Sequence, residues 1–254
     1  MKVLITRPRN QADSFADALA NIGFEPIFFP VIEIHPFEEN VALDRAIAKL
    51  ECYDWVVFTS VNGVDAFFAR MNAAPQKALL PENVKVSAIG PKTAQSLRVR
   101  GIEPCFVPVE YVAEAILPGL GDLRGCWVLL PRAEIARKAL PEAIMEVGGV
   151  AHEIAVYQTL PAEIDRVGLA ALKSGVDVIT FTSPSTVENF VEIVRSTGLN
   201  PLSLPGNPKI ACIGPITQKA AEEAGFVGTL VAEEYTADGL VGLLRNSILV
   251  NHKS

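Results

Sequence analysis

Short apolar runs alternate with segments of helical periodicity along the whole chain. The runs are continuous stretches of hydrophobic residues and do not alternate with polar ones, which is typical of parallel strands buried on both faces. The predicted strands are residues 3–6, 25–29, 55–59, 84–89, 104–107, 127–130, 152–156, 178–182, 209–213 and 229–231.

The segments between these runs carry apolar residues at helical spacing. Phe15, Leu19 and Ile22 form one stripe, and Gly23 is expected to end that helix. Another stripe recurs in both halves of the chain: Val64, Phe67, Phe68 and Met71, then Val187, Phe190, Val191 and Val194. Stripes of this kind are typical of a core. Strand–helix alternation therefore predicts an α/β fold whose parallel sheets are flanked by helices.

The sequence also contains a long internal repeat. FTSVNGV from Phe58 recurs as FTSPSTV from Phe181, and AIGPKTAQSL from Ala88 recurs as CIGPITQKAA from Cys212. EYVAEAIL from Glu110 recurs as EYTADGLV from Glu234, and VLITRP from Val3 corresponds more faintly to VLLPRA from Val128. The offset runs from 123 residues (58 to 181) to 125 (3 to 128). The two halves therefore share one architecture.

Two proline-flanked segments without helical periodicity interrupt the pattern at corresponding places inside the repeats. They are residues 30–37 (PVIEIHPF) and 156–163 (VYQTLPAE). If they are connectors, residues 38–151 form a continuous α/β domain, and residues 1–31 plus 163–254 form a discontinuous one. The connector strands would then be residues 32–37 and 152–162. A simpler division near Gly125 remains open from the spacing alone. Pro141 interrupts the helix expected at 135–147, so that helix is expected to start late.

The loops at the carboxyl ends of the predicted strands are candidates for ligand binding, because open parallel sheets bind ligands there. These loops contain small, hydroxyl-bearing and glycine residues, at positions 6–8, 59–62, 90–93, 131–132, 182–185 and 214–217. Backbone amides at a helix start bind anions without Lys or Arg. The same residue types also serve simply as caps, which is the alternative for any single turn.

Composition and charge exclude several classes of function. The net charge is −7 and basic residues do not cluster, which argues against a nucleic-acid partner. No apolar run approaches the roughly 18–20 residues of a membrane span. The cysteines and histidines lack metal-type spacing, and no GxGxxG or P-loop motif is present. We therefore expect no metal, no cofactor, no membrane contact and a reducing cytoplasm.

Several of these motifs, in this order and spacing, resemble the uroporphyrinogen-III synthase family over nearly the whole chain. They are VLITRP, the FTS turn in each half, AIGPKTA with CIGPITQ, and VYQT from Val156. The resemblance implies two flavodoxin-like α/β domains joined by a two-stranded connector. It also implies a cofactor-free enzyme of tetrapyrrole biosynthesis, monomeric, that receives the linear tetrapyrrole hydroxymethylbilane from hydroxymethylbilane synthase. Such an enzyme dehydrates and cyclises the bilane to uroporphyrinogen III, inverting ring D through a spiro-pyrrolenine.

The resemblance also assigns site residues. Tyr157 matches the functional tyrosine, which would donate a hydrogen bond or proton to the leaving hydroxyl. The alternative is a connector tyrosine that packs its ring and bonds locally. Positions matching contacts to substrate carboxylates are Thr93, Ser183, Ser185 and Thr217, with Ser60 and Lys209 as weaker matches. Arg7 is typical of bacterial members, where pairing between domains is an alternative role.

Two other classes of function compete with the enzyme. A two-lobed protein that clamps a small anion would share the architecture, but the N-terminus does not resemble a signal peptide. A regulatory domain derived from this family would need a partner domain, and the sequence ends soon after the second repeat. Turnover of hydroxymethylbilane separates both from the enzyme.

Overall fold

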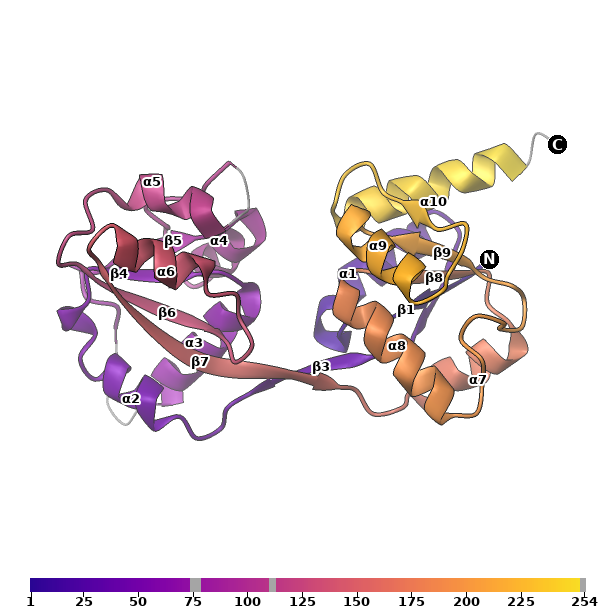
Figure 1. Ribbon diagram of the computed structural model, residues 1–254, viewed down its shortest axis with the longest axis horizontal. Coiled ribbons are helices and arrows are strands. Elements are labelled where there is room, and N and C mark those ends of the chain that lie inside the picture. Colours follow the sequence, from indigo (N-terminus) through magenta and orange to yellow (C-terminus); the bar gives the residue numbers. More distant parts are fainter. Residues whose placement is uncertain (74–78, 110–112, 252–254) are drawn as a thin grey trace. The chain divides into compact units, whose positions relative to one another are not determined.

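The computed structural model describes residues 1–73, 79–109 and 113–251. The chain forms two compact units: a first unit of Met1–Glu33 with Leu160–Ser254, and a second unit of Ile34–Thr159. Each unit contains one five-stranded sheet (Figure 1). The predicted α/β class, with parallel sheets flanked by helices, is confirmed.

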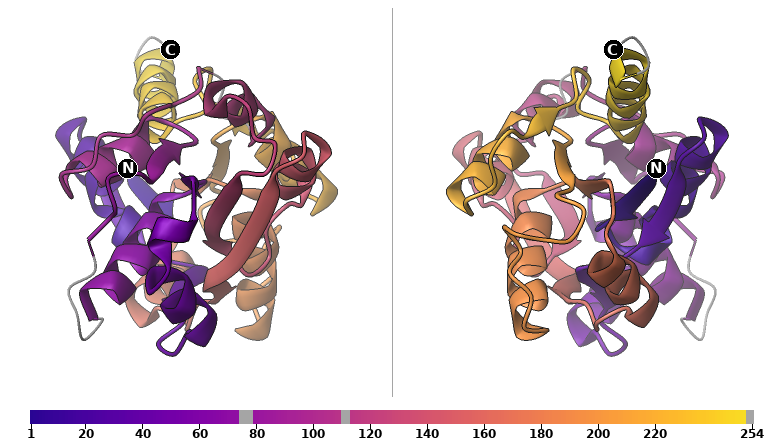
Figure 2. Two further views of the ribbon diagram at one scale, coloured as in Figure 1. Left: turned by 90° about the vertical axis from the view of Figure 1, so that its left-hand side faces the viewer. Right: turned by 90° about the vertical axis from the view of Figure 1, so that its right-hand side faces the viewer.

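The sheet of the first unit is parallel and has the order β10-β9-β8-β1-β2. Its strands are β1 (Lys2–Ile5), β2 (Glu25–Phe28), β8 (Val178–Phe181), β9 (Lys209–Cys212) and β10 (Leu230–Val231). Counted along this unit, the order is 2-1-3-4-5, which is the flavodoxin order. The indigo N-terminal strands and the orange strands from the last third of the chain stand side by side (Figures 1 and 2).

Helices cover both faces of this first sheet. They are α1 (Asp13–Asn21), α7 (Arg166–Ser174), α8 (Pro184–Ser196), α9 (Pro215–Glu223) and α10 (Ala237–Asn251), with a 3-10 turn, η1, at Arg9–Gln11. Phe15 and Leu19 of α1 pack with Leu240 of α10 on one face. Phe190 of α8 and Leu172 of α7 belong to the cluster on the other. This explains why the strands are continuous apolar runs: neither face of the sheet meets water.

The second sheet has the order β3-β7-β6-β4-β5. Its strands are β3 (Ile32–Pro36), β4 (Trp55–Phe58), β5 (Lys85–Ala88), β6 (Trp127–Ala133) and β7 (Val150–Pro161). Strands β7, β6, β4 and β5 pair in parallel. The predicted strand at 104–107 is reduced to one parallel bridge between Ser87 and Phe106, at the place of a strand beyond β5.

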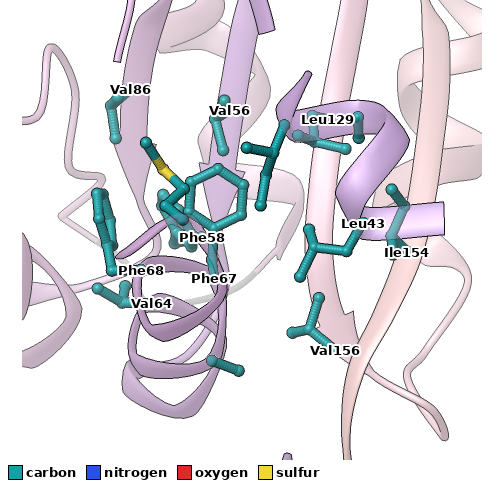
Figure 3. Close-up of a cluster of buried hydrophobic side chains, with 14 of the residues drawn as sticks. Leu43, Val56, Phe58, Val64, Phe67, Phe68, Val86, Leu129, Ile154 and Val156 are labelled. Atoms are coloured by element: carbon teal, nitrogen blue, oxygen red, sulfur yellow. The ribbon is translucent and has the colours of Figure 1, made fainter. Parts of the chain in front are cut away.

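Side chains of β4 show how the second core is divided. Val56 and Phe58 point to the face covered by α2 (Val41–Ile47), α3 (Val61–Ala73) and α4 (Pro91–Arg98) (Figure 3). Phe58 meets Phe67 of α3 edge-on, with ring centroids 5.4 Å apart. Trp55 and Val57 point to the opposite face. The remaining elements are η2 (Leu50–Cys52), η3 (Ala113–Ile116), α5 (Leu117–Leu120) and α6 (Ala139–Glu146).

The repeats and the units are out of phase. The first unit joins β1 and β2, from the first repeat, to β8, β9 and β10, from the second. The second unit joins β6 and β7, from the second repeat, to β4 and β5, from the first. Each sheet therefore needs strands from both repeats, and β1 and β4 lie in different sheets.

The two segments that pass between the units run along each other as β3 and β7. The Phe37 amide donates to the Val156 carbonyl at 3.2 Å, and the Ala162 amide donates to the Val31 carbonyl at 3.1 Å. Residue numbers rise along one segment and fall along the other, so this pairing is antiparallel. This antiparallel pair is the two-stranded connector that was predicted as part of the fold.

Two local expectations have different outcomes. Helix α6 starts at Ala139, with Pro141 in its first turn, so the late start expected from the proline is confirmed. Cys105 lies in the strand predicted at 104–107 and is exposed, because that strand does not form beyond the bridge at Phe106.

The division of the sheets predicts how fragments of this chain fold. Residues 34–159 contain β4, β5 and β6 whole and most of β7, with helices on both faces, so we expect this fragment to fold alone with a cooperative thermal transition. Residues 1–125, one complete repeat, contain strands of two different sheets and should remain unfolded. Circular dichroism and thermal melting of both fragments test this. A cooperative transition in 1–125 would show that the repeat, and not the unit, is the folding domain.

Candidate functional site

Each sheet has one position where the strand order reverses, and ligands of such sheets bind at the carboxyl ends of the strands there. In the first unit this position lies between β1 and β8. Thr6 donates its hydroxyl to the Thr180 carbonyl at 2.6 Å, and the Thr180 hydroxyl donates to the Leu4 carbonyl at 2.9 Å. These buried bonds join the two strands. In the second unit the corresponding position lies between β6 and β4.

The helix that follows the reversal point starts with a serine cap in both units. Ser60 accepts a hydrogen bond from the Gly63 amide at 3.0 Å before α3. Ser183 Oγ accepts one from the Thr186 amide at 3.2 Å before α8, and Thr186 Oγ1 accepts one from the Ser183 amide. This second arrangement is a capping box. The amides of Gly63 and Thr186 are therefore already satisfied, and for them the capping interpretation holds.

The next helix in each unit starts differently. Gly90 precedes α4 and Gly214 precedes α9, each followed by proline, and glycine offers no side chain to cap the helix. The first helical bonds run from the Ala94 amide to the Gly90 carbonyl at 2.9 Å, and from the Gln218 amide to the Gly214 carbonyl at 3.0 Å.

Because the first amides of a helix have no partner inside it, residues 92–93 and 216–217 present donors that have no hydrogen-bond partner among the described residues. The positive end of the helix dipole adds to their attraction for an anion. Thr93 and Thr217 direct their side chains into the core. Their backbone amides, and not their hydroxyls, are therefore the groups that this start offers to a ligand.

Tyr157 lies on β7 and belongs to the second unit's core. Arg132 pairs with Ala155, but Ala133 pairs with Tyr157, so a bulge adds one residue on β7 at this point. The ring is packed in the cluster of Phe58 and is 7% exposed. Its hydroxyl oxygen lies 3.1 Å from Ser60 Oγ. The sequence placed Tyr157 on a connector, and the structure places it where that strand leaves the core.

The phenol therefore meets the serine cap of α3. Since Ser60 Oγ also accepts the Gly63 amide, three groups form a short chain: amide, serine hydroxyl and phenol. Either hydroxyl, that of Ser60 or that of Tyr157, can be the donor in the bond between them. In the corresponding connector, residues 30–37, the sequence contains no tyrosine, so this arrangement belongs to one unit only.

Arg132 is the next-to-last residue of β6, and its two Nη atoms have partners while its Nε has none among the described residues. Its Nη1 lies 3.1 Å from Glu153 Oε2, and its Nη2 donates to the Arg137 carbonyl at 2.7 Å. Glu153 also meets Lys138 Nζ at 3.0 Å. Residues 131–132 were expected to form an anion-binding loop, but they belong to β6, where the arginine is held by a part-buried ion pair.

Arg7 follows β1 at the reversal point of the first unit. Its Nη2 reaches Gln11 Oε1 only at 3.4 Å. Its Nε is buried without a hydrogen-bond partner among the residues that the structure describes. Burial lowers the pKa of the guanidinium from its usual value. A buried donor without a partner is uncommon in folded proteins, and a carboxylate would satisfy it.

The structure brings most of the predicted residues to the carboxyl edges of their sheets. In the first unit these are Arg7, Ser183, Ser185 and Thr217; in the second they are Ser60, Thr93 and Tyr157. Lys209 is different, because it is the first residue of β9 and its amide pairs with the Asp177 carbonyl at 2.9 Å. It therefore lies at the amino edge of the first sheet, opposite Ser183 and Thr217.

Sequence reasoning missed three contributors to the site. Gly90 and Gly214 were treated as part of the turns, although the missing side chain is what leaves the amides free. The Glu153 partner of Arg132 was also missed. The signal for the glycines was present, since Gly-Pro recurs at the helix start where Ser recurs in the neighbouring turn.

The described residues show neither a metal site nor a membrane-spanning helix. No group of three or more His, Cys, Asp or Glu side chains is arranged to hold a metal ion there. No helix in that part of the chain is long and apolar enough to cross a membrane.

Comparison with known proteins assigns the chain. A sequence model of the family described as "Uroporphyrinogen-III synthase HemD" matches residues 13–242. The chain belongs to the uroporphyrinogen-III synthase family. Members of this family are enzymes of porphyrin biosynthesis, cyclising lyases by reaction class.

Individual relatives cover the whole length. The protein named uroporphyrinogen-III synthase from Synechococcus elongatus is 32% identical over 94% of this chain and 92% of its own. A putative uroporphyrinogen-III synthase from Methanocaldococcus jannaschii is also 32% identical, over 96% and 98%. The crystal structure of the Helicobacter pylori uroporphyrinogen-III synthetase shares the fold, with a TM-score of 0.68 at 18% identity over 97% of this chain and 99% of that one.

The serine caps yield a stability prediction. Ser183→Ala removes the acceptor for the Thr186 amide, so we expect a loss of about 1 kcal/mol in the free energy of unfolding. Ser185→Ala is the matched control, because Ser185 Oγ contacts Ser183 Oγ at 2.9 Å but caps no amide, and it should change stability less. Urea denaturation of both variants measures this difference. Equal losses would contradict a capping role for Ser183.

Proposed function

We propose that this protein catalyses the family's reaction, closing hydroxymethylbilane to uroporphyrinogen III with inversion of ring D. Family membership over residues 13–242 is the observation that carries the proposal. In this reaction ring A loses its hydroxyl as water and becomes an electrophilic azafulvene. Ring D attacks through its substituted carbon, and the resulting spiro-pyrrolenine fragments and recloses with ring D inverted.

The glycine-capped helix starts are proposed to bind substrate carboxylates. Hydroxymethylbilane carries eight acidic side chains, and a carboxylate is the group that helix-start amides such as those at Thr93 or at Thr217 bind. The protein has a net charge of −7, and helix amides attract anions without adding basic side chains. Several such contacts, each of about 0.3–1 kcal/mol at an exposed site, hold a flexible polyanion in one conformation. Positioning of this kind decides which carbon of ring D attacks.

Ser183 and Ser185 are proposed to contribute differently from Thr217. The Ser183 oxygen caps α8, so the hydroxyls of this pair, 2.9 Å apart, are the groups offered to a carboxylate. Arg7 is proposed to complete this edge of the first unit. Its Nε has no hydrogen-bond partner among the described residues and could donate to a bound carboxylate, although Arg132 Nε is in the same state. Lys209, at the opposite edge, is not part of this proposal.

Tyr157 is proposed to assist departure of the hydroxyl. The Gly63 amide donates to Ser60 Oγ, and we assign the Ser60 hydroxyl as donor to the Tyr157 oxygen. This direction leaves the phenol proton free for the leaving hydroxyl, which departs as water. It also stabilises negative charge that develops on the phenol oxygen. A packed ring and a fixed hydroxyl keep that donor in one place.

Four further properties are proposed from the family assignment. The protein is expected to act as a monomer in the cytoplasm, and to receive the unstable bilane from hydroxymethylbilane synthase. No metal or cofactor is needed, because the bilane generates its own electrophile and the enzyme mainly directs closure.

Substitution at Gly214 tests the anion-binding amides. Ser183 and Gly214 share nearly the same extended backbone, with φ of −165° and −169°. Gly214→Ser should therefore install a cap like that of Ser183, which competes with a substrate carboxylate for the same amide. We expect KM to rise about fivefold and the melting temperature to lie above that of Gly214→Ala, since both variants place a Cβ 3.3 Å from the Tyr235 ring but only serine caps the helix.

Gly214→Ala is the matched control, because it adds the same Cβ without the capping oxygen. Steady-state kinetics of both variants, with melting temperatures, separate steric and capping effects. A KM for Gly214→Ser no higher than that of Gly214→Ala would count against carboxylate binding at α9.

Substitution at Tyr157 tests the proposed donor. Tyr157→Phe keeps the packed ring and removes the hydroxyl, so folding should be unaffected. A positioned acid contributes roughly 10²- to 10⁴-fold, and loss of water from this bilane is already easy. We therefore expect kcat to fall by about 100-fold or somewhat less, with more uroporphyrinogen I formed by closure without inversion.

Ser60→Gly tests the link to the phenol. Glycine at a helix cap costs only a few tenths of a kcal/mol, so stability should change little while kcat falls several-fold. Stopped assays with separation of the type I and type III products provide both readouts. Normal turnover in a folded Tyr157→Phe protein would leave Tyr157 with a packing role. Binding of hydroxymethylbilane without any turnover by the unaltered protein would favour an anion-binding protein over the enzyme.

A further inference from the structure

One repeated motif has no role in the function proposed above. A Glu-Tyr pair occurs at Glu110–Tyr111 and again at Glu234–Tyr235. Each tyrosine follows the glycine cap of its half by the same distance, 21 residues (90 to 111 and 214 to 235). Glu110 and Tyr111 lie outside the described residues. The structure describes the second copy.

Tyr235 stands beside the free amides of α9. It lies in the turn between β10 and α10, at the carboxyl edge of the first sheet. A Cβ on Gly214 would meet Cγ and Cδ1 of the tyrosine ring at 3.3 Å, so the ring lies directly against the cap residue. This close approach gives Gly214 a second reason to lack a side chain.

The backbone of Tyr235 is held in a tight turn although the residue is exposed. Thr236 donates its amide to the Glu234 carbonyl at 2.7 Å, and its hydroxyl accepts from the Gly239 amide at 3.0 Å. Any Cβ on Gly239 would collide with the Glu234 carbonyl, so the turn closes as tightly as glycine permits. The backbone is therefore held on both sides of a residue that is 66% exposed.

A second large apolar side chain is exposed at the same helix start. Ile216, whose amide is one of the free donors, is 67% exposed. An aromatic ring and an aliphatic side chain thus flank two unpaired amides on a rigid edge. Flat molecules that carry a carboxylate match this combination, because one part covers apolar surface while the other reaches the amides.

We propose that Tyr235 is a binding residue for one pyrrole ring of the substrate, whose carboxylate meets the amides of Ile216 and Thr217. The inference rests on the proposed function and adds a contact between Tyr235 and a pyrrole ring of the substrate. A pyrrole of the bilane is flat and electron-rich, and its acidic side chains are short. A ring held against Tyr235 therefore keeps its carboxylate near the start of α9. This contact selects a carboxylated pyrrole over an acyclic polycarboxylate.

Three substitutions at Tyr235 separate ring, hydroxyl and apolar area. Tyr235→Phe keeps the aromatic face and should retain KM within about twofold. Tyr235→Leu keeps apolar area without the ring, and Tyr235→Ala removes both. We expect KM for hydroxymethylbilane to rise about tenfold in Tyr235→Ala, with an intermediate rise in Tyr235→Leu, while kcat stays within about twofold. The melting temperature should stay the same, since the ring is exposed.

Val227→Ala is the control for an exposed apolar residue of the same unit, because Val227 is 89% exposed in the preceding loop. Its KM should equal that of the unaltered protein. An unchanged KM in a folded Tyr235→Ala protein that still forms uroporphyrinogen III would overturn this inference and leave the function intact. If the unaltered protein forms no uroporphyrinogen III from hydroxymethylbilane, the proposed function fails, and the contact to a pyrrole ring fails with it.

Discussion

The whole molecule depends on one constraint: a parallel strand must be followed by a crossover before its neighbour can be added. Here the crossovers are mostly helices, and they cover both faces of both sheets. Every such helix begins at the carboxyl edge, because the chain leaves each strand there. Helix amides and helix dipoles are therefore gathered at one edge of each sheet, without any need for basic side chains at those positions.

Capping then decides which of these amides are available. Ser60 and Ser183 satisfy amides of the helices at the two reversal points, while Gly90 and Gly214 leave those of the next helices unpaired. The same alternation of serine and glycine occurs in both units, so in each unit one turn caps its helix and the neighbouring turn leaves helix amides available. The units differ at the phenol, because Tyr157 contacts Ser60 and the other connector has no tyrosine.

Both proposed tyrosine contacts lie on a fixed backbone, although one tyrosine is buried and the other is exposed. Tyr157 is buried and held by a bulge and a serine, whereas Tyr235 is exposed and held by a tight turn. In both cases the backbone is fixed before any ligand arrives, so little conformational entropy remains to be lost on binding. A substrate with many rotatable bonds needs such a fixed site, because ordering the substrate already costs conformational entropy.

The sequence by itself determined the α/β class, most strands and the positions of the turns, because apolar runs and helical stripes are local signals. It also determined the family, since motif order survives in the linear chain. The strand predicted at 209–213 already places Lys209 at the amino edge of its sheet. Tertiary structure alone decided that Arg132 pairs with Glu153, since that pair joins neighbouring strands. It also decided that Gly214 lies against Tyr235, because contacts between distant residues depend on packing that no local pattern encodes.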